Sequence, residues 1–161
     1  MRMLKCVVVS LLLIFAGYGV AVADGVNIEG LPVWLGDTVD KVKEVYQTKL
    51  DPEPSESPIQ RGSTALRLKT KGVWFFFNRD GKIYTIRIEA PFHGTINGVK
   101  IGDTASKMLK VLGQPAKVPK PIAGLTNVML PRTYIYYLDD VTTANFQVNS
   151  DDEIETVFLL K

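Results

Sequence analysis

The sequence predicts an α+β fold in which two tandem units, each a helix followed by antiparallel strands, join into one long sheet with the helices on one face. The first observation is a repeated block: residues 35–42 (LGDTVDKV) return in 101–108 (IGDTASKM), a shift of 101 − 35 = 66. The second is a repeated hairpin, because residues 75–86 align with 146–157 at a shift of 146 − 75 = 71. Both copies should therefore build the same layered unit around a shared core.

The N-terminus predicts a secretory signal peptide over residues 1–23. Arg2 and Lys5 precede an apolar run at 7–15, and Ala21-Val22-Ala23 provides small residues for cleavage near Ala23. The run is too short for a spanning helix, so we expect a periplasmic or secreted chain with no membrane span after cleavage. An uncleaved membrane anchor is the alternative.

Removal of this leader changes the composition of the chain. The leader contains Cys6, the only cysteine, so the remaining 161 − 23 = 138 residues have no thiol or disulfide. Its removal also takes away two of the 19 basic residues and none of the 17 acidic ones. The formal net charge of the remaining chain is therefore 17 − 17 = 0. A neutral chain gives no electrostatic reason to expect nucleic acid or an anionic membrane as partner.

Each unit is predicted to begin with a short amphipathic helix. Thr38 and Thr104 precede these helices as N-caps, because a threonine hydroxyl can accept a backbone N–H one turn later. An anion site at the helix N-termini is the alternative. The apolar residues at helical spacing are Val39, Val42, Val45 and Tyr46 in the first helix, and Met108, Leu109, Val111 and Leu112 in the second.

The remainder of each unit is predicted as a proline-rich loop followed by three strands. The loops, at 51–58 and 115–124, should lie on the surface because proline excludes helix and central strand. We place the first unit at 24–92 and the second at 93–161. The predicted strands are 65–69, 73–77 and 82–89 in the first, and 133–138, 144–148 and 153–160 in the second.

Alternation along the first hairpin divides its side chains between two faces. A four-residue tip at 78–81 places Phe75 opposite Tyr84 and Val73 opposite Ile86. One face then carries Val73, Phe75, Phe77, Tyr84, Ile86 and Ile88, and the other carries Trp74, Phe76, Ile83, Thr85, Arg87 and Glu89.

The second unit indicates which face is the core. Phe75 aligns with Phe146, so that position is apolar twice, whereas Trp74 and Phe76 align with Asn145 and Gln147. Large aromatic side chains and arginine on an open sheet are typical of interface hot spots. The alternatives to partner binding are that the proline-rich loops cover these side chains, or that the chain associates with itself through them. The predicted partner-binding face consists of Trp74, Phe76, Arg87, Gln147 and Phe158.

Two segments carry a family resemblance: residues 101–115, with Ile-Gly-Asp-Thr and Val-Leu-Gly-Gln-Pro, and residues 75–83, FFFNRDGKI. They resemble the tandem-repeat β-lactamase inhibitor protein and the related small lipoprotein accessory of bacterial outer-membrane β-barrel assembly. The resemblance implies a long sheet whose concave face grips a protein, with hairpin tips entering the target's active site. The matching tip residues are Arg79, Asp80, Ser150 and Asp151.

The chain departs from both groups. The inhibitor's domains carry disulfides, which the mature chain lacks. The assembly accessory is a lipoprotein with a single repeat, whereas this chain has two repeats and Cys6 lies before the apolar run.

Residues for catalysis or cofactor binding are sparse. His93 is the only histidine, and beside Gly94 we expect it in a loop. The acidic pairs at 139–140 and 151–153 lack the spacing of a calcium loop, so turns are expected there, with weak calcium binding as the alternative. We expect no cofactor and no metal.

These observations predict an exported, non-enzymatic protein-binding module that is a monomer or weak dimer. The concrete form is an inhibitor or immunity protein that blocks a secreted hydrolase or toxin. An envelope-assembly or maintenance factor that binds an outer-membrane complex is the alternative. A third reading is a small-ligand carrier or minor hydrolase that uses the acids and His93.

Overall fold

The computed structural model describes residues 26–55, 62–120 and 131–161. The predicted signal peptide, with Cys6 and Ala23, lies outside the described residues, as do parts of both proline-rich loops. The elements are, in chain order, β1 (Ile28–Glu29), α1 (Val39–Tyr46), β2 (Glu53–Pro54), β3 (Thr64–Leu68), the 3-10 turn η1 (Lys69–Lys71), β4 (Val73–Phe77), β5 (Ile83–Glu89), β6 (Thr95–Ile96), α2 (Ala105–Leu112), β7 (Arg132–Tyr137), β8 (Thr143–Val148) and β9 (Ile154–Leu160).

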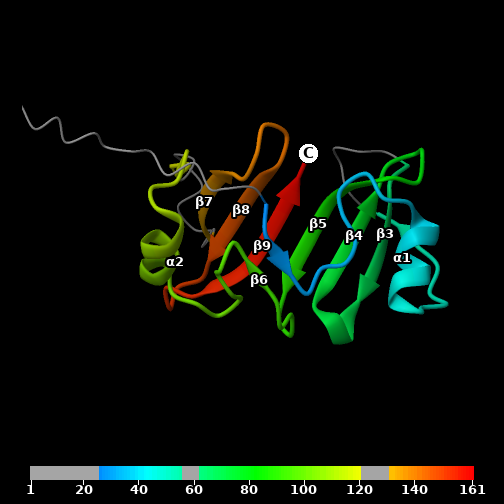
Figure 1. The fold of residues 1–161 in the computed structure, drawn as a ribbon, viewed down its shortest axis with the longest axis horizontal. Coiled ribbons are helices and arrows are strands. Elements are labelled where there is room, and N and C mark those ends of the chain that lie inside the picture. Colours follow the sequence, from blue (N-terminus) through cyan, green and yellow to red (C-terminus); the bar gives the residue numbers. More distant parts are fainter. Residues whose placement is uncertain (1–25, 56–61, 121–130) are drawn as a thin grey trace, which may run out of the picture.

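One antiparallel sheet of seven strands runs through the molecule in the order β2-β3-β4-β5-β9-β8-β7 (Figure 1). The last strands of the two units, β5 and β9, pair at its centre, where Arg87 lies opposite Phe158 and Ile88 opposite Val157. The predicted α+β fold with one continuous sheet is therefore confirmed.

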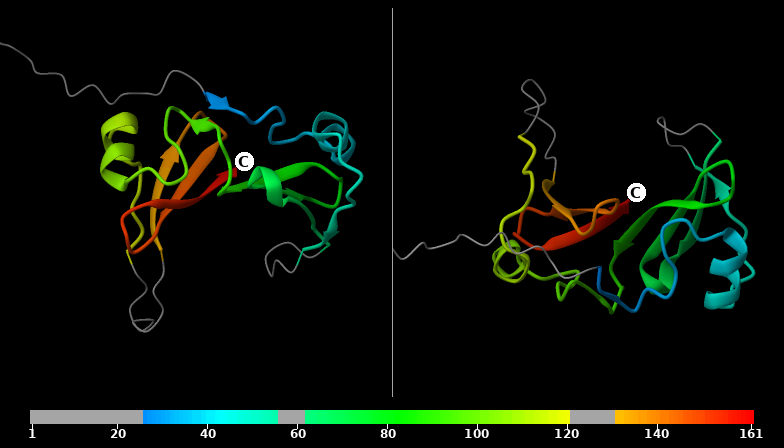
Figure 2. Two further views of the ribbon diagram at one scale, coloured as in Figure 1. Left: turned by 90° about the horizontal axis from the view of Figure 1, so that it is seen from below. Right: turned by 45° about the horizontal axis from the view of Figure 1, so that its top comes forward.

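One face of this sheet is covered. Figure 1 views the molecule from that side, with α1 and α2 at the two ends and the β1–β6 ribbon crossing in front of the central strands. Figure 2 shows the same layering from two further directions. Val42 of α1 and Met108 of α2 are fully buried beneath the helices. The opposite face, which we call the open face, has no helix over it within the described residues.

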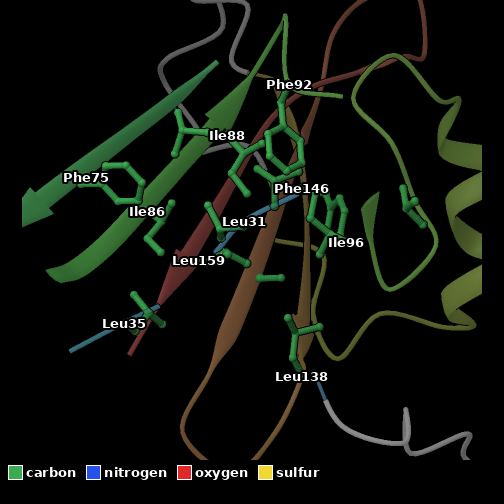
Figure 3. Packing of buried hydrophobic residues seen from close by; sticks show 14 of the residues in the cluster. Leu31, Leu35, Phe75, Ile86, Ile88, Phe92, Ile96, Leu138, Phe146 and Leu159 are labelled. Carbon is green, nitrogen blue, oxygen red and sulfur yellow. The ribbon is translucent and has the colours of Figure 1, made fainter. Parts of the chain in front are cut away.

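The core lies between the sheet and this cover (Figure 3). Its largest fully buried side chains come from both halves of the sheet. They include Phe75, Phe77, Ile86 and Ile88 from the first unit and Phe146, Ile154 and Leu159 from the second.

The repeated Gly-Asp-Thr segment binds the start of each helix to the last strand of its own unit. The amide of Gly36 donates to the carbonyl of Ile83 at 2.8 Å, and the amide of Gly102 donates to that of Ile154 at 2.8 Å. Both glycines have a positive φ, +95° and +86°, which explains why glycine occupies this bend in both units.

Both predicted N-caps are confirmed. The hydroxyl of Thr38 accepts the backbone N–H of Lys41 at 3.3 Å, and that of Thr104 accepts the N–H of Lys107 at 3.2 Å. Each bond satisfies one of the backbone donors that a helix leaves free at its first turn.

The predicted pairing within the first hairpin was wrong. Phe75 lies opposite Ile86 instead of Tyr84, and Val73 lies opposite Ile88 instead of Ile86. The register shifts between Phe76 and Phe77 because β5 contains one extra residue there, a β-bulge.

The bulge also exchanges two predicted side-chain directions. Ile83, assigned to the open face, is only 2% exposed in the core, whereas Tyr84, assigned to the core, is half-buried near Phe76. A register shift at the equivalent place in the second hairpin leaves Glu155 as the extra residue between Ile154 and Thr156. The bulge is thus a property of the repeated unit.

Candidate functional site

Trp74 and Phe76 point to the open face, because side chains alternate along β4 and Val73, Phe75 and Phe77 are buried on the other side. The two rings are nearly parallel, with centroids 6.3 Å apart and planes 6° apart. Both side chains are half-buried, so part of each ring remains accessible. The predicted orientation of these two residues agrees with the structure.

Charged side chains hold the indole of Trp74 in place. The guanidinium carbon of Arg67 lies 3.9 Å from the ring centroid and that of Arg87 lies 5.3 Å from it, both within cation–π range. The indole Nε1 donates a hydrogen bond to the Glu89 carboxylate at 2.8 Å. Glu89 also pairs with Arg87 at 2.6 Å and with Arg67 at 3.3 Å. We call these four residues and Phe76 the Trp74 cluster.

The fixed geometry of the Trp74 cluster would reduce the entropy lost if a ligand bound to it. One carboxylate between two guanidinium groups leaves an excess positive charge beside an aromatic surface. The cluster therefore suits an apolar or aromatic group that carries negative charge nearby.

The Trp74 cluster belongs to a row that crosses the open face. Its residues come from six strands and are neighbours by strand pairing: Arg67, Trp74, Arg87, Phe158, Asn145 and Ile135. Arg87 reaches the second unit, because its guanidinium carbon lies 5.8 Å from the centroid of the Phe158 ring. The predicted residues Trp74, Arg87 and Phe158 are therefore neighbours in this row, and Phe76 lies beside Trp74 in the next row.

Two atoms of this row are buried without a hydrogen-bond partner among the described residues, Nε of Arg87 and Oδ1 of Asn145. A folded protein seldom leaves buried polar atoms unpaired, because each costs about 1–3 kcal/mol. Arg87 and Asn145 lie on either side of Phe158 in this row.

The remaining predicted site residues lie elsewhere. Gln147 is on the open face, but in another row, opposite Thr156 and Thr133. The exposed tip residues are at opposite ends of the sheet, since the β4–β5 and β8–β9 turns point in opposite directions (Figure 1). These residues are Arg79 and Asp80 at the first tip and Ser150 and Asp151 at the second.

The two hairpin tips share one internal structure. The side-chain oxygen of Asn78 accepts the amides of Asp80 and Lys82 at 3.0 Å each, and that of Asn149 accepts the amides of Asp151 and Glu153 at 2.9 and 3.0 Å. The acidic pair at 139–140 also belongs to a turn. The amide of Val141 donates to the carboxylate of Asp139 at 2.8 Å, and this is the first of the hydrogen bonds that lower the pKa of Asp139.

A groove of about 1170 Å³ adjoins the Trp74 cluster. Trp74, Phe76, Arg67 and Arg87 form part of its lining, and the loop that follows α1 forms another wall, from Tyr46 onward. Sequence reasoning missed this groove. The available signal was the lysine pair of the η1 turn, Lys69 and Lys71, beside a strand with Arg67 on its outward face.

Other chemistry has little structural support in the described residues. His93 is exposed in the segment between the units. Within 26–55, 62–120 and 131–161, no three His, Cys, Asp or Glu side chains gather closely enough to hold a metal ion. In the same residues, neither helix is long and apolar enough to cross a membrane.

Comparison with known proteins gives a distant likeness in structure. No protein-family model and no curated protein sequence matches the chain. Among solved structures, the chain is similar to a DUF4309 family protein (YjgB) from Bacillus subtilis, with 18% identity and a TM-score of 0.47. That similarity covers 77% of this chain and 78% of the other.

Proposed function

We propose that the chain is an exported, non-enzymatic protein-binding module whose open face is its binding surface. Its concrete form is an inhibitor or immunity protein that blocks a secreted or periplasmic enzyme or toxin. The observation that carries this proposal is the Trp74 cluster. It presents two parallel aromatic rings, flanked by arginines, on a sheet face without a covering helix among the described residues.

The composition of this surface supports a protein partner. Tryptophan, tyrosine and arginine dominate the residues that contribute most to protein interfaces, especially when they lie in a rigid, partly desolvated setting. Arg87 and Phe158 bring the same combination of arginine and aromatic ring to the centre of this face, where β5 pairs with β9.

Cover by the first proline-rich loop is the competing explanation for these rings. In the described part of that loop, Glu53 and Pro54 pair with the edge of β3, beside Ala65 and Thr64. The loop thus forms a wall of the groove, and part of both rings stays accessible.

The experiment uses the mature chain from residue 24, immobilised and exposed to envelope and culture-supernatant extracts of the source organism. We expect one partner in stoichiometric amount. Replacing Trp74→Ala together with Phe76→Ala should weaken that complex by about 2–4 kcal/mol, as expected for buried hot spots. If the partner is a hydrolase or toxin, its activity should fall in proportion to the mature chain added.

A matched control is available at the other end of the sheet. Tyr137 and Val141 are 69% and 60% exposed, and Tyr137→Ala with Val141→Ala should leave the complex unchanged. Equal Kd values for the Trp74/Phe76 variant and the unaltered chain would rule out the open face as the binding surface. Recovery of barrel-assembly components in place of an enzyme would favour the envelope-assembly alternative.

A further inference from the structure

The outer edge of the first unit is only partly paired. β2 has two residues and contacts β3 only at Thr64 and Ala65. Beyond that point no strand of the described residues pairs with the outer side of β3, from Leu66 to Leu68. A strand edge of this kind presents backbone donors and acceptors that can pair with another extended chain.

The groove runs beside this unpaired edge. Its lining includes Arg67 and Leu68 of β3, and the facing wall is the segment that follows α1, residues 46–51. Since Arg67 points to the open face and Leu68 to the core, an added strand here would place alternate side chains on those two sides. Those on the open side would meet Trp74 and Phe76, which also line the groove.

The groove is positively charged although the mature chain is neutral. Five basic side chains line it against two acidic ones, Asp51 and Glu53, and 5 − 2 gives an excess of three. Asp51 pairs with Lys43, and Arg67 and Arg87 pair with Glu89. Lys43 and Glu89 lie outside the lining, and including both leaves the excess at 6 − 3, again three. The five are Lys49, Arg67, Lys69, Lys71 and Arg87.

The η1 turn fixes two of these lysines at the end of β3. Gly72 closes the turn with a φ of +66°, and its amide donates to the carbonyl of Lys69 at 3.3 Å. A Cβ at Gly72 would lie 2.1 Å from the carbonyl oxygen of Glu89, so only glycine fits there. Lys69 and Lys71 therefore project from a backbone that is held against β5.

We infer that the groove binds an extended, acidic segment of a partner protein, which adds to the sheet as a strand along β3. Backbone hydrogen bonds along the free edge supply affinity. Carboxylates of the segment meet Lys49, Lys69 and Lys71, and its apolar side chains pack on Trp74 and Phe76. This inference rests on the proposed function and specifies the chemistry of the partner.

The test measures binding of labelled peptides of about ten residues to the mature chain by fluorescence anisotropy. The probe alternates glutamate and valine. One comparison peptide alternates lysine and valine, and a second carries an N-methyl group on every backbone amide of the probe. We expect the glutamate peptide to bind at least about tenfold more tightly than the lysine peptide, with affinity falling as salt rises. N-methylation should abolish binding, because it removes the donors that pair with a strand edge.

Charge reversal in the chain provides the second arm. Lys49→Glu, Lys69→Glu and Lys71→Glu together should weaken binding of the glutamate peptide at least about tenfold. The matched control reverses three exposed lysines of the second unit and should stay within about twofold. They are Lys100→Glu, Lys110→Glu and Lys120→Glu. Equal affinity for the acidic and basic peptides, or unchanged binding after N-methylation or after reversal of the groove lysines, would overturn the inference.

The two proposals fail separately. If the natural complex is lost in the Trp74/Phe76 variant but survives reversal of the groove lysines, the groove inference is wrong and the open-face proposal stands. If the complex survives both changes, both are wrong.

Discussion

The two halves of the sheet are alike on the covered face and different on the open face. On the covered side, Phe75 of the first unit corresponds to Phe146 of the second, and both are fully buried. On the open side, strand pairing equates Arg67, Trp74 and Arg87 with Ile135, Asn145 and Phe158 in the second unit. Packing beneath the helices requires the same residue types twice, whereas the open face is free to specialise.

The specialised half is the first. Its open face combines aromatic rings with a network of charges around Glu89, whose counterpart in the second unit is the apolar Leu160. The groove also lies entirely beside the first unit. The proposed binding surface therefore lies mainly on the first half of the sheet.

The largest effect tests the likeness of the two cores. Phe75→Ala and Phe146→Ala should each lower the free energy of unfolding by about 3–5 kcal/mol, because each leaves a cavity at a fully buried site. Urea denaturation of the two variants measures this loss. If Phe146→Ala lowers the free energy of unfolding by less than half as much as Phe75→Ala, the core of the second unit is less tightly packed than that of the first.

The next effect tests the difference between the open faces. Trp74→Asn with Phe76→Gln gives the first unit the residues of the second, and it should weaken the partner complex by about 2–4 kcal/mol. The free energy of unfolding should change by only about 1 kcal/mol, since both side chains are half-buried. Asn145→Ala with Gln147→Ala is the matched change in the second unit. If that pair weakens the complex equally, binding is shared by both halves.

The sequence predicted the joined sheet, the two helices with their caps, and the outward direction of Trp74 and Phe76. Its error at Ile83 and Tyr84 has a physical cause: a bulge adds one residue and reverses alternation locally, and a tip length alone does not reveal it. The repeat held the missing signal, because Ile83 aligns with the apolar Ile154 while Tyr84 aligns with Glu155.

Clustering on the open face was less predictable than the direction of single residues. Gln147 shares the open face with Trp74 but lies in another row, and the two tips lie at opposite ends of the sheet. The order of strands across the sheet decides which residues become neighbours. The groove depends on a loop that follows α1 and on where β2 ends. Neither position follows from alternation within a hairpin.

A smaller effect tests the likeness of the helix starts. Thr38→Ala and Thr104→Ala should each cost about 1 kcal/mol of unfolding free energy, because each removes a hydrogen bond to a free backbone donor. Thr38→Ser and Thr104→Ser retain the hydroxyl and should recover most of that loss. Urea midpoints at neutral pH provide the measurement, and a serine variant as unstable as its alanine counterpart would contradict the capping role.

In each unit a tyrosine packs against the corresponding core phenylalanine, but the two tyrosines come from different elements. In the first, Tyr46 at the end of α1 lies beside Phe75, with ring centroids 5.6 Å apart. In the second, Tyr136 of β7 lies beside Phe146, also at 5.6 Å. Both cores therefore contain a tyrosine–phenylalanine pair, with the tyrosine on a helix in the first unit and on a strand in the second.

These tyrosines differ in what their hydroxyls bind. The hydroxyl of Tyr136 donates to the carbonyl of Gly113 at 3.0 Å, whereas that of Tyr46 is buried without a partner among the described residues. Tyr136→Phe should therefore cost about 1 kcal/mol, while Tyr46→Phe should be close to neutral or slightly stabilising. Comparison of the two variants by urea denaturation at pH 7 tests this contrast, which fails if both changes have the same sign and size.

The same hydroxyls give the unfolding free energy a dependence on alkaline pH. Burial raises the pKa of Tyr46 to about 12, and burial with the nearby Tyr134 raises the pKa of Tyr136 to about 12, above the ordinary value of 10.0 for a tyrosine phenol. Between these values the unfolded chain loses its phenolic protons while the folded chain keeps them, so stability is full below pH 10 and falls as pH rises towards 12. Each Tyr→Phe variant should lose part of this slope and the double variant should lose more, as measured by urea midpoints from pH 9 to 11.5. A double variant with an unchanged slope would show that other groups set the alkaline limit, since only the phenols of these two residues differ between the chains.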